Sequence, residues 1–272
     1  MRIHHLNCGS MTTPGGRIVC HVLLCETANG LVLVDAGFGL DDVRDPKRRL
    51  GLSAKLLGAK LDESETAIRQ VEALGYQPGD VRDIVITHFD LDHVGGLSDF
   101  PDARVHVSRT EWDAAQNPSP RERIRYRRSQ FRHHPRILTY AADGEKWRGL
   151  PAAQPLDGLG NEFALVPIVG HSRGHSAIAV DAGEAGWLLH AGDAYFHPSA
   201  LGKASTLSRR GAFFTGFEYF MAVDPRRMRQ GHRTLSALPS DVTVFSAHDQ
   251  DEFARLARKG ETDRGPTEPS PS

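Results

Sequence analysis

Short apolar runs recur along the chain, and most of them end at glycine, aspartate or histidine. We interpret these runs as buried β-strands because they are rich in leucine and β-branched residues: GLVLVDAGFG, VRDIVITH, ARVHVS, FALVPIVG, SAIAVDA, GWLLHAGD and VTVFSAHD. The stretch SETAIRQVEALG has helical spacing and predicts a capped amphipathic helix that ends at Gly75. A second helix is predicted near Arg109 to Gln116. Strands mixed with helices over this length predict a layered α/β architecture.

Two pairs of these segments resemble each other. LVLVDAGF around Asp35 is similar to WLLHAGDAYF around Asp193, and VITHFDLDH around His88 is similar to VFSAHDQDEF around His248. The two pairs are almost equally spaced. We therefore expect two similar halves with a functional site at their junction. Chance similarity of short strand ends is the alternative.

The chain of 272 residues is long enough to bury a sizeable core. We expect a single domain over residues 1–258 and a disordered tail over residues 259–272, which are rich in proline, serine and glutamate. An arginine-dense insertion, RERIRYRRSQFRHHPR, interrupts the regular pattern at about residues 119–148. It predicts a lid or a binding loop for an anionic group, or else a solvated connector.

Composition narrows the classes of partner. The formal net charge is −1, so nothing in the charge balance demands a nucleic acid or another polyanion. The N-terminus has no apolar run after a basic start, and no stretch approaches the roughly eighteen apolar residues of a membrane span. We expect a soluble cytoplasmic protein without a membrane partner. Three cysteines without CxxC spacing predict small buried residues, with a ligand or nucleophile as the alternative: Cys8, Cys20 and Cys25.

The stretch THFDLDHVGG, from Thr87 to Gly96, carries the densest candidate chemistry. In an extended backbone His88 and Asp90 point to the same side, whereas the adjacent Asp92 and His93 diverge unless the chain turns there. The glycine pair supplies permissive backbone for such a turn. This geometry suits two neighbouring cations. Imidazole and carboxylate together favour zinc, iron, manganese or cobalt over calcium.

Three further polar clusters follow predicted strands. GHSRGH contains His171 and His175, AGD contains Asp193, and SAHD contains His248. Because α/β folds build their sites at strand ends on one face, these side chains are expected to converge with those of the first cluster.

The order THxxxDHxGG, GHSxGH, GD and a late histidine resembles the metallo-β-lactamase fold hydrolases, and its pattern is closest to lactonase-like members of the quorum-quenching type. The resemblance runs from about Leu31 to His248. It implies an αββα sandwich of two similar halves, with a dinuclear metal site at one edge of the two central sheets.

The resemblance also implies roles for individual residues. The first metal would be bound by His88, Asp90 and His171, the second by Asp92, His93 and His248, and Asp193 would bridge them. Asp92 would also take part in catalysis. Asp35 would brace the site without binding metal, and His175 would support the ligands. The implied cofactors are two divalent ions, with zinc placed first.

Asp90 departs from the commonest family pattern, HxHxDH, in which this position is histidine. With two divalent ions, the charges of three carboxylates and a bridging hydroxide sum to neutrality, whereas a histidine would leave one positive charge. We expect a neutral cluster to acidify its bound water less, and oxygen ligands to favour iron or manganese more. The iron-containing flavodiiron branch of this fold also has a carboxylate here. Alternatively, Asp90 swings away and only one metal binds tightly.

The implied reaction is attack by a metal-bound hydroxide on the carbonyl of a small ester or lactone. Tyr195, two residues after Asp193, is a candidate hydrogen-bond donor to the substrate oxygen, with a packed aromatic as the alternative. The aromatic run from Ala212 to Met221 predicts either an acyl-chain pocket or a core helix.

Three alternative functions stay open. One is a thioester hydrolase of the glyoxalase II type. The others, ranked lower, are an iron site for redox chemistry and a metal-binding sensor without catalysis. A small-molecule substrate is expected in the hydrolytic interpretations, and a homodimer is compatible with the sequence.

Overall fold

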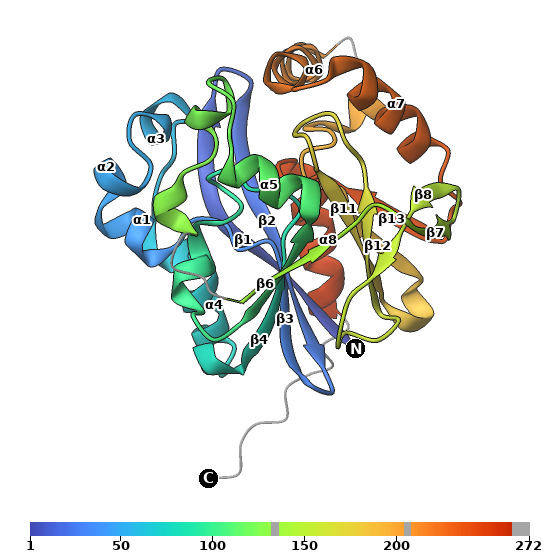
Figure 1. Cartoon of the computed structure of the whole chain (residues 1–272), viewed down its shortest axis with the longest axis horizontal. Helices are drawn as coiled ribbons and strands as arrows, with labels where there is room; N and C mark the ends of the chain where they lie inside the picture. The colour runs from blue at the N-terminus through green and yellow to red at the C-terminus, as the bar shows by residue number, and fades with distance from the viewer. Residues whose placement is uncertain (132–135, 204–207, 263–272) are drawn as a thin grey trace.

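Two mixed β-sheets form the centre of the molecule (Figure 1). The computed structural model describes residues 1–131, 136–203 and 208–262. The first sheet has the strand order β1–β2–β3–β4–β5–β6. Its strands are β1 (Arg2–Thr13), β2 (Gly16–Thr27), β3 (Gly30–Val34), β4 (Val81–Val85), β5 (Arg104–Ser108) and β6 (Ile137–Tyr140). The first three strands pair antiparallel, and β3 to β6 pair parallel.

The second sheet has the strand order β13–β12–β11–β10–β9. Its strands are β9 (Gln154–Pro155), β10 (Phe163–Pro167), β11 (Ser176–Asp181), β12 (Trp187–His190) and β13 (Val242–Phe245). Strands β9 to β12 pair antiparallel, and β12 pairs parallel with β13. A separate hairpin is formed by β7 (Gly144–Trp147) and β8 (Leu150–Ala152).

The two sheets repeat one connection pattern. In the first, β1, β2 and β3 form an antiparallel meander, after which the chain crosses over to the parallel strand β4. In the second, β10, β11 and β12 form the same meander, followed by the parallel strand β13. The segments with similar sequence are the third and fourth strands of each half. The predicted internal repeat therefore matches the architecture.

Both faces of the first sheet are buried, which explains the continuous apolar runs. Along β3, Leu31 and Leu33 pack into a cluster with helix residues such as Ile68. Val32 and Val34 point the other way, into a cluster shared with residues of the second sheet. Each such side chain contributes about 1.5–3 kcal/mol through burial. The core between the two sheets fixes their relative position, and with it the position of their strand ends.

Helices cover the outer faces of the sheets, and Figure 1 shows α1 to α4 beside the first half and α6 and α7 at the edge of the second. The α-helices are α1 (Leu40–Arg44), α2 (Pro46–Arg49), α3 (Ser53–Leu56), α4 (Ala67–Ala73), α5 (Arg109–Gln116), α6 (Arg209–Met221), α7 (Pro225–Ser236) and α8 (Gln250–Thr262). Short 3₁₀ turns are η1 (Glu63–Glu65), η2 (Pro78–Asp80), η3 (Gly95–Asp99), η4 (Glu122–Ile124), η5 (Arg128–Gln130), η6 (Gly183–Ala185) and η7 (Pro198–Leu201).

Capping residues define where helices begin. Asp224 accepts hydrogen bonds from the backbone N–H groups of Arg226 and Arg227 at the start of α7, and Pro225 occupies its first turn. Within the described residues, no helix has the length and apolar character needed to cross a bilayer. The architecture is the two-halved α/β sandwich that the sequence predicts.

The structure adds detail to two boundaries expected from the sequence and shows two strands that were not expected. The segment 119–148 includes β6, which pairs with β5 in the first sheet, and its role as a lid stays a prediction. Residues 132–135, including His133 and His134, lie outside the described part. The predicted tail begins later than 259, because α8 continues to Thr262; residues 263–272 lie outside the described part. The long strands β1 and β2 were not predicted.

Candidate metal centre

The candidate ligands all follow strands at one edge of the two sheets. His88, Asp90, Asp92 and His93 follow β4, Asp193 follows β12, and His248 follows β13. His171 lies in the connection between β10 and β11. All seven are buried, with exposed fractions of 7% or less. The structure thus brings together every candidate metal ligand that the resemblance implies.

The backbone after β4 turns sharply, which separates the two pairs of ligands. The N–H of His93 donates to the carbonyl of Asp90 at 3.0 Å. The chain then passes so close to the loop after β3 that no side chain fits: a Cβ on Gly96 would lie 2.5 Å from the Ala36 carbonyl, and one on Gly95 would lie 1.9 Å from Asp42 Oδ2. The glycine pair is therefore required for close approach.

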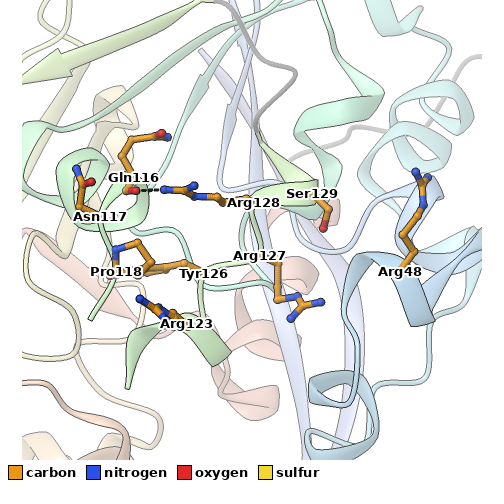
Figure 2. Close-up of a pocket in the computed structure, with 9 residues that line it drawn as sticks. All are labelled: Arg48, Gln116, Asn117, Pro118, Arg123, Tyr126, Arg127, Arg128 and Ser129. Carbon is orange, nitrogen blue, oxygen red and sulfur yellow. Dashed lines mark hydrogen bonds between the residues drawn. The ribbon is translucent and has the colours of Figure 1, made fainter. Parts of the chain in front are cut away.

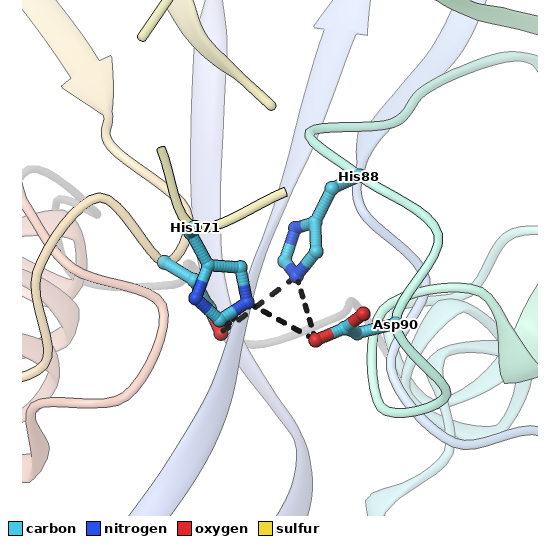
Figure 3. A group of neighbouring side chains, drawn as sticks. His88, Asp90 and His171 are labelled. Carbon is cyan, nitrogen blue, oxygen red and sulfur yellow. Dashed lines mark hydrogen bonds and ion pairs between the residues drawn. The ribbon is translucent and has the colours of Figure 1, made fainter. Parts of the chain in front are cut away.

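We call His88, Asp90 and His171 the first set; Figure 3 shows their side chains converging. The Oδ2 atom of Asp90 lies 3.4 Å from His88 Nε2 and 3.0 Å from His171 Nε2. The Oδ2 atom of Asp193 lies 3.7 Å from His88 Nε2 and 3.3 Å from His171 Nε2. Four ligand atoms from three segments of the chain thus surround one point.

We call Asp92, His93 and His248 the second set. The Oδ2 atom of Asp92 lies 3.9 Å from His93 Nε2 and 3.5 Å from His248 Nε2. The Oδ1 atom of Asp193 lies 3.2 Å from His93 Nε2 and 3.1 Å from His248 Nε2. Asp193 Oδ1 therefore faces the second set, whereas Oδ2 faces the first set and also lies 3.2 Å from His248 Nε2. The carboxylate lies between the two sets, which is the position of a bridging ligand.

These separations fit bound metal ions. A tetrahedral ion with bonds of about 2.0–2.1 Å holds its ligand atoms about 3.3 Å apart. Three buried ligand atoms have no hydrogen-bond partner in the described structure: His88 Nε2, His93 Nε2 and Asp193 Oδ1. Two of these atoms, His93 Nε2 and Asp193 Oδ1, lie 3.2 Å apart in the second set. Because buried polar atoms without a partner are costly, their convergence indicates that a cation completes them. The donors available are nitrogen and carboxylate oxygen, which suit zinc, iron or manganese.

Neighbouring residues fix the orientation of the ligands. His93 Nδ1–H donates to Asp35 Oδ2 at 2.8 Å, and the backbone N–H of Thr87 donates to Asp35 Oδ1 at 2.8 Å. His248 Nδ1–H donates to the carbonyl of Val19 at 2.8 Å. The hydrogen bonds of the two Nδ1–H groups leave the Nε2 lone pairs of His93 and His248 directed into the site. Asp35 thus lies where it can brace the site, as the resemblance implies. Its backbone is in the left-handed region, with a φ of 60°.

His175 supports the site without joining either set. Its Nδ1–H donates to the Ile168 carbonyl at 2.9 Å, and its Nε2 accepts from the backbone N–H of Asp193 at 3.0 Å. Both ring nitrogens are therefore used. A Cβ on Gly192 would lie 2.6 Å from that Nε2, so glycine is required beside the bridging aspartate. This placement agrees with the supporting role implied for His175.

The electrostatics of the second set favour a cation. Burial alone would lower the pKa of His93, but Asp193, Asp35 and Asp92 outweigh it and raise that pKa well above the ordinary value. Burial would raise the pKa of Asp193, but His248 and His93 hold it well below the ordinary value. Asp193 is therefore ionised and places negative charge beside the imidazoles, as a divalent ion requires.

Arg125 is a site residue that the sequence analysis missed. It follows η4 in the arginine-rich segment and is 6% exposed. Its Nε donates to both Asp90 carboxylate oxygens, at 2.8 and 3.0 Å, and its Nη2 donates to Asp90 Oδ2 at 2.7 Å. Burial alone would raise the pKa of Asp90, but Arg125 and His88 hold it well below the ordinary value. The only signal in the sequence was the density of arginine around it.

Arg125 changes the charge count made from the sequence. The ion pair with Asp90 is neutral, so together the two residues carry the charge of the neutral histidine found in the commonest pattern. The expectation that Asp90 leaves a neutral cluster, with less acidic bound water, omitted this guanidinium. The argument that the bound water is less acidic is therefore removed, whereas the preference of oxygen ligands for iron or manganese stands.

The other arginines of this segment that the structure describes are exposed or half-buried. Arg123, Arg127 and Arg128 line a surface pocket of about 700 Å³ together with Tyr126 and Arg48 (Figure 2). Arg128 donates to the Gln116 carbonyl, and Arg127 donates to the Arg49 carbonyl at 3.1 Å. The segment thus has an outer cationic surface and one arginine that points into the metal centre. Binding of an anionic group at the outer surface stays a prediction.

Tyr195 does not join the site. Its side chain is fully buried, and its hydroxyl donates to the Glu252 carboxylate at 3.0–3.1 Å. It packs in the apolar cluster of the second half with residues such as Leu235. The predicted contact of its hydroxyl with a substrate oxygen is therefore corrected: Tyr195 is the packed aromatic of the alternative interpretation.

Ser172 lies in GHSRG, which matches the GxSxG pattern of serine hydrolases. It is 1% exposed, and its hydroxyl donates to Glu111 Oε2 at 2.7 Å. The required strand–turn–helix elbow is missing, because the motif connects the strands β10 and β11. The match therefore reflects the His171 loop and does not indicate a serine nucleophile.

Aromatic side chains border the second half of the site. The Phe196 ring lies 5.0 Å from the His248 ring and 5.8 Å from the His171 ring, measured between centroids. Phe217 of α6 lies 5.6 Å from Phe196, while Phe220 of the same helix is 73% exposed. Part of the aromatic run thus contributes to the surroundings of the site.

The three cysteines are free and buried, as expected.

Comparison with known proteins agrees with this geometry. The family model of the metallo-beta-lactamase superfamily matches residues 15–201. The chain therefore belongs to the metallo-beta-lactamase superfamily, and it is a metallo-hydrolase. A probable metallo-hydrolase of Mycobacterium tuberculosis is 45% identical over 268 residues, which cover 95% of this chain and 83% of that protein. The N-acyl homoserine lactonase AttM of Agrobacterium fabrum is 29% identical over 264 residues, covering 96% and 93%.

Solved structures show the same fold at lower identity. An N-acyl homoserine lactone hydrolase, with the product N-hexanoyl-L-homoserine at its catalytic metal centre, is 20% identical with a TM-score of 0.69 and covers 93% of this chain and 95% of that chain. A dizinc quorum-quenching lactonase is 17% identical with a TM-score of 0.55, covering 85% and 73%. The predicted family, fold and enzyme class are confirmed.

Proposed function

We propose that this metallo-hydrolase acts on the carbonyl of a small ester or lactone, with an N-acyl lactone as the leading substrate class. The observation that carries the proposal is the position of the Asp193 carboxylate between the two sets, with Oδ2 facing the first and Oδ1 facing the second. Relatives named as lactonases support the substrate class. The expected metal is zinc, with iron and manganese as alternatives.

Ions held by these ligands would supply a nucleophile at neutral pH and a Lewis acid for the carbonyl. The protein's own residues do the positioning. Asp193 holds the two sets at a fixed separation, and Asp35 and His175 keep His93 and Asp193 in place. We assign Asp92 the transfer of a proton to the leaving oxygen, because its carboxylate adjoins His248 at 3.5 Å and is 7% exposed.

The aromatic border suits an acyl chain. Phe196 packs against two candidate ligands and belongs to an apolar cluster with Leu91, Phe214 and Phe38, to which Phe213 and Phe217 add half-buried surface. An apolar wall beside a polar centre favours a substrate with a hydrocarbon part next to its carbonyl and excludes water from the reacting atoms.

The test compares acid release from a medium-chain N-acyl homoserine lactone, a simple aryl ester and an S-acyl glutathione. The protein is reconstituted separately with zinc, manganese and iron. We expect hydrolysis of the lactone to have the highest kcat/KM and to disappear in His88→Ala. His197→Ala is the matched control, because that half-buried histidine hydrogen-bonds Ser199 and belongs to neither set. Turnover of the thioester alone would replace the proposal with a function of the glyoxalase II type.

A further inference from the structure

We propose that Arg125 and a metal ion compete for the first set, so that the protein binds one divalent ion tightly, at the second set. A second ion enters the first set only when Arg125 withdraws. This inference rests on the metal assignment made above, and it concerns how many ions the centre holds and which residue controls that number.

All five N–H donors of Arg125 are committed inside the protein. Nε and one Nη2–H go to Asp90, and Nη1 donates to the carbonyls of His171 and Met221, both at 2.9 Å. The remaining Nη2–H contacts His171 Nε2. The guanidinium is therefore anchored from three segments of the chain and has no donor left for a substrate.

The contact with His171 Nε2 creates the competition. An imidazole nitrogen has one lone pair, and it can either accept the hydrogen bond from Arg125 or bind a metal. Asp90 Oδ2 likewise accepts from Nη2 at the same place. An ion in the first set would displace these bonds and face a positive guanidinium beside it.

The second set has no such competitor. Within the described residues, no lysine or arginine contacts Asp92, His93 or His248. Its Nδ1 atoms bond Asp35 and the Val19 carbonyl, which leaves both Nε2 atoms for a metal. Asp193 Oδ1 lies 3.1–3.2 Å from these atoms and completes a set of four. This set should bind an ion as the protein stands.

The identity of residue 90 agrees with this account. A carboxylate receives the planar fork of an arginine through two oxygens, which a histidine cannot do. Asp90 in place of the usual histidine and Arg125 on the arginine-rich segment thus form one device. Because residue 90 is aspartate, the first set can bind the Arg125 guanidinium where a metal ion would otherwise bind.

The test measures metal stoichiometry, without any substrate. Metal-depleted wild type, Arg125→Met and the control Arg123→Met are titrated with Zn²⁺ by calorimetry, and the metal retained after gel filtration is measured by mass spectrometry. Methionine keeps much of the length of arginine but removes its charge. We expect one retained ion per chain in wild type and in Arg123→Met, and two in Arg125→Met. The second ion should bind wild type at least about 100-fold more weakly than the first.

Two retained ions of similar affinity in wild type would overturn the proposal, as would one ion in a folded Arg125→Met. If that variant does not fold, a Co²⁺ titration of wild type decides: visible absorption that saturates at one equivalent supports the proposal, and saturation at two opposes it. Failure of lactone hydrolysis would sink the proposed function and leave this stoichiometry intact, so the two can fail separately.

Discussion

Asp35 Oδ2 accepts a hydrogen bond from His93 Nδ1 at 2.8 Å. Through this bond Asp35, in the loop after β3, orients the ring of His93, a candidate ligand in the loop after β4. The same carboxylate accepts the Thr87 backbone N–H through Oδ1. One aspartate therefore fixes both the loop that carries four ligands and the tautomer of one of them. Both carboxylate oxygens of Asp35 are thus occupied by hydrogen bonds within the protein.

Asp35→Asn is expected to weaken metal binding about 10- to 100-fold, with a parallel loss of kcat, because an amide N–H in place of Oδ2 would oppose the His93 Nδ1–H. Zn²⁺ affinity and lactone turnover check this. The matched control is Asp83→Asn, since Asp83 forms a similar buried pair with His106, also at 2.8 Å, away from the ligands. The control should lose stability but keep metal affinity. Equal loss of affinity in both variants would contradict the role of Asp35.

Asp90→His restores the commonest pattern and is nevertheless expected to destabilise the protein, by about 3–5 kcal/mol, because it leaves the buried guanidinium of Arg125 without its counter-charge. Adding Arg125→Met to that variant should recover much of the loss. Urea unfolding of the two single variants and the double variant gives the coupling energy. Additive effects would show that the pair does not act as a unit.

Tyr195→Phe is expected to leave kcat and KM of lactone hydrolysis unchanged and to cost about 1–2 kcal/mol of stability, because the hydroxyl bonds Glu252 and not the site. Steady-state kinetics beside thermal unfolding separates the two effects. A large fall in kcat at unchanged stability would return Tyr195 to the role predicted from the sequence.

Glu218→Gln should stabilise the protein increasingly as pH rises. Burial raises the pKa of Glu218 from 4.5 to about 8, although the Phe196 N–H lowers it in part. Between pH 4.5 and about 8 the Glu218 carboxyl keeps its proton in the folded state and loses it in the unfolded state. The free energy of unfolding of the wild type therefore falls as pH rises through this range, and the destabilisation by Glu218 is complete above about pH 8. The gain of the glutamine variant has a ceiling on the order of 5 kcal/mol.

Urea unfolding of wild type and Glu218→Gln at pH 5 and pH 8.5 measures this difference, and the exposed Glu145→Gln is the control. We expect a larger gain at pH 8.5 than at pH 5 for residue 218 and the same small effect at both values for residue 145. A gain independent of pH at residue 218 would mean that its carboxyl titrates normally in the folded protein.

The convergence of the candidate ligands could be predicted because each follows a strand in a short, distinctive sequence motif. His88 to His93, His171, Asp193 and His248 need only the rule that strand ends meet at one edge of a sheet. The strand predictions held where runs were continuously apolar, as in β3 and β12. Strands β1 and β2 were not predicted, because buried polar residues such as His4, Ser10 and His21 interrupt their apolar pattern.

Arg125 and Tyr195 could not be placed from the sequence, because tertiary contacts decide where they point. Arg125 is one of many arginines in its segment, and only the folded path between α5 and β6 directs it to Asp90. Tyr195 lies two residues from Asp193, but Glu252 of α8, distant in sequence, draws its hydroxyl away from the ligands. The spacing of two residues along the chain shows that they are close, but it does not show where their side chains point.

The most direct test of the metal centre is lactone hydrolysis by metal-depleted protein before and after adding Zn²⁺, for wild type and for His93→Ala. Wild type is predicted to show only the uncatalysed rate when depleted and to regain turnover with added metal, while His93→Ala stays inactive at the same metal concentration. Turnover by the metal-depleted protein, or full recovery in His93→Ala, would contradict the assignment of these residues as a catalytic metal centre.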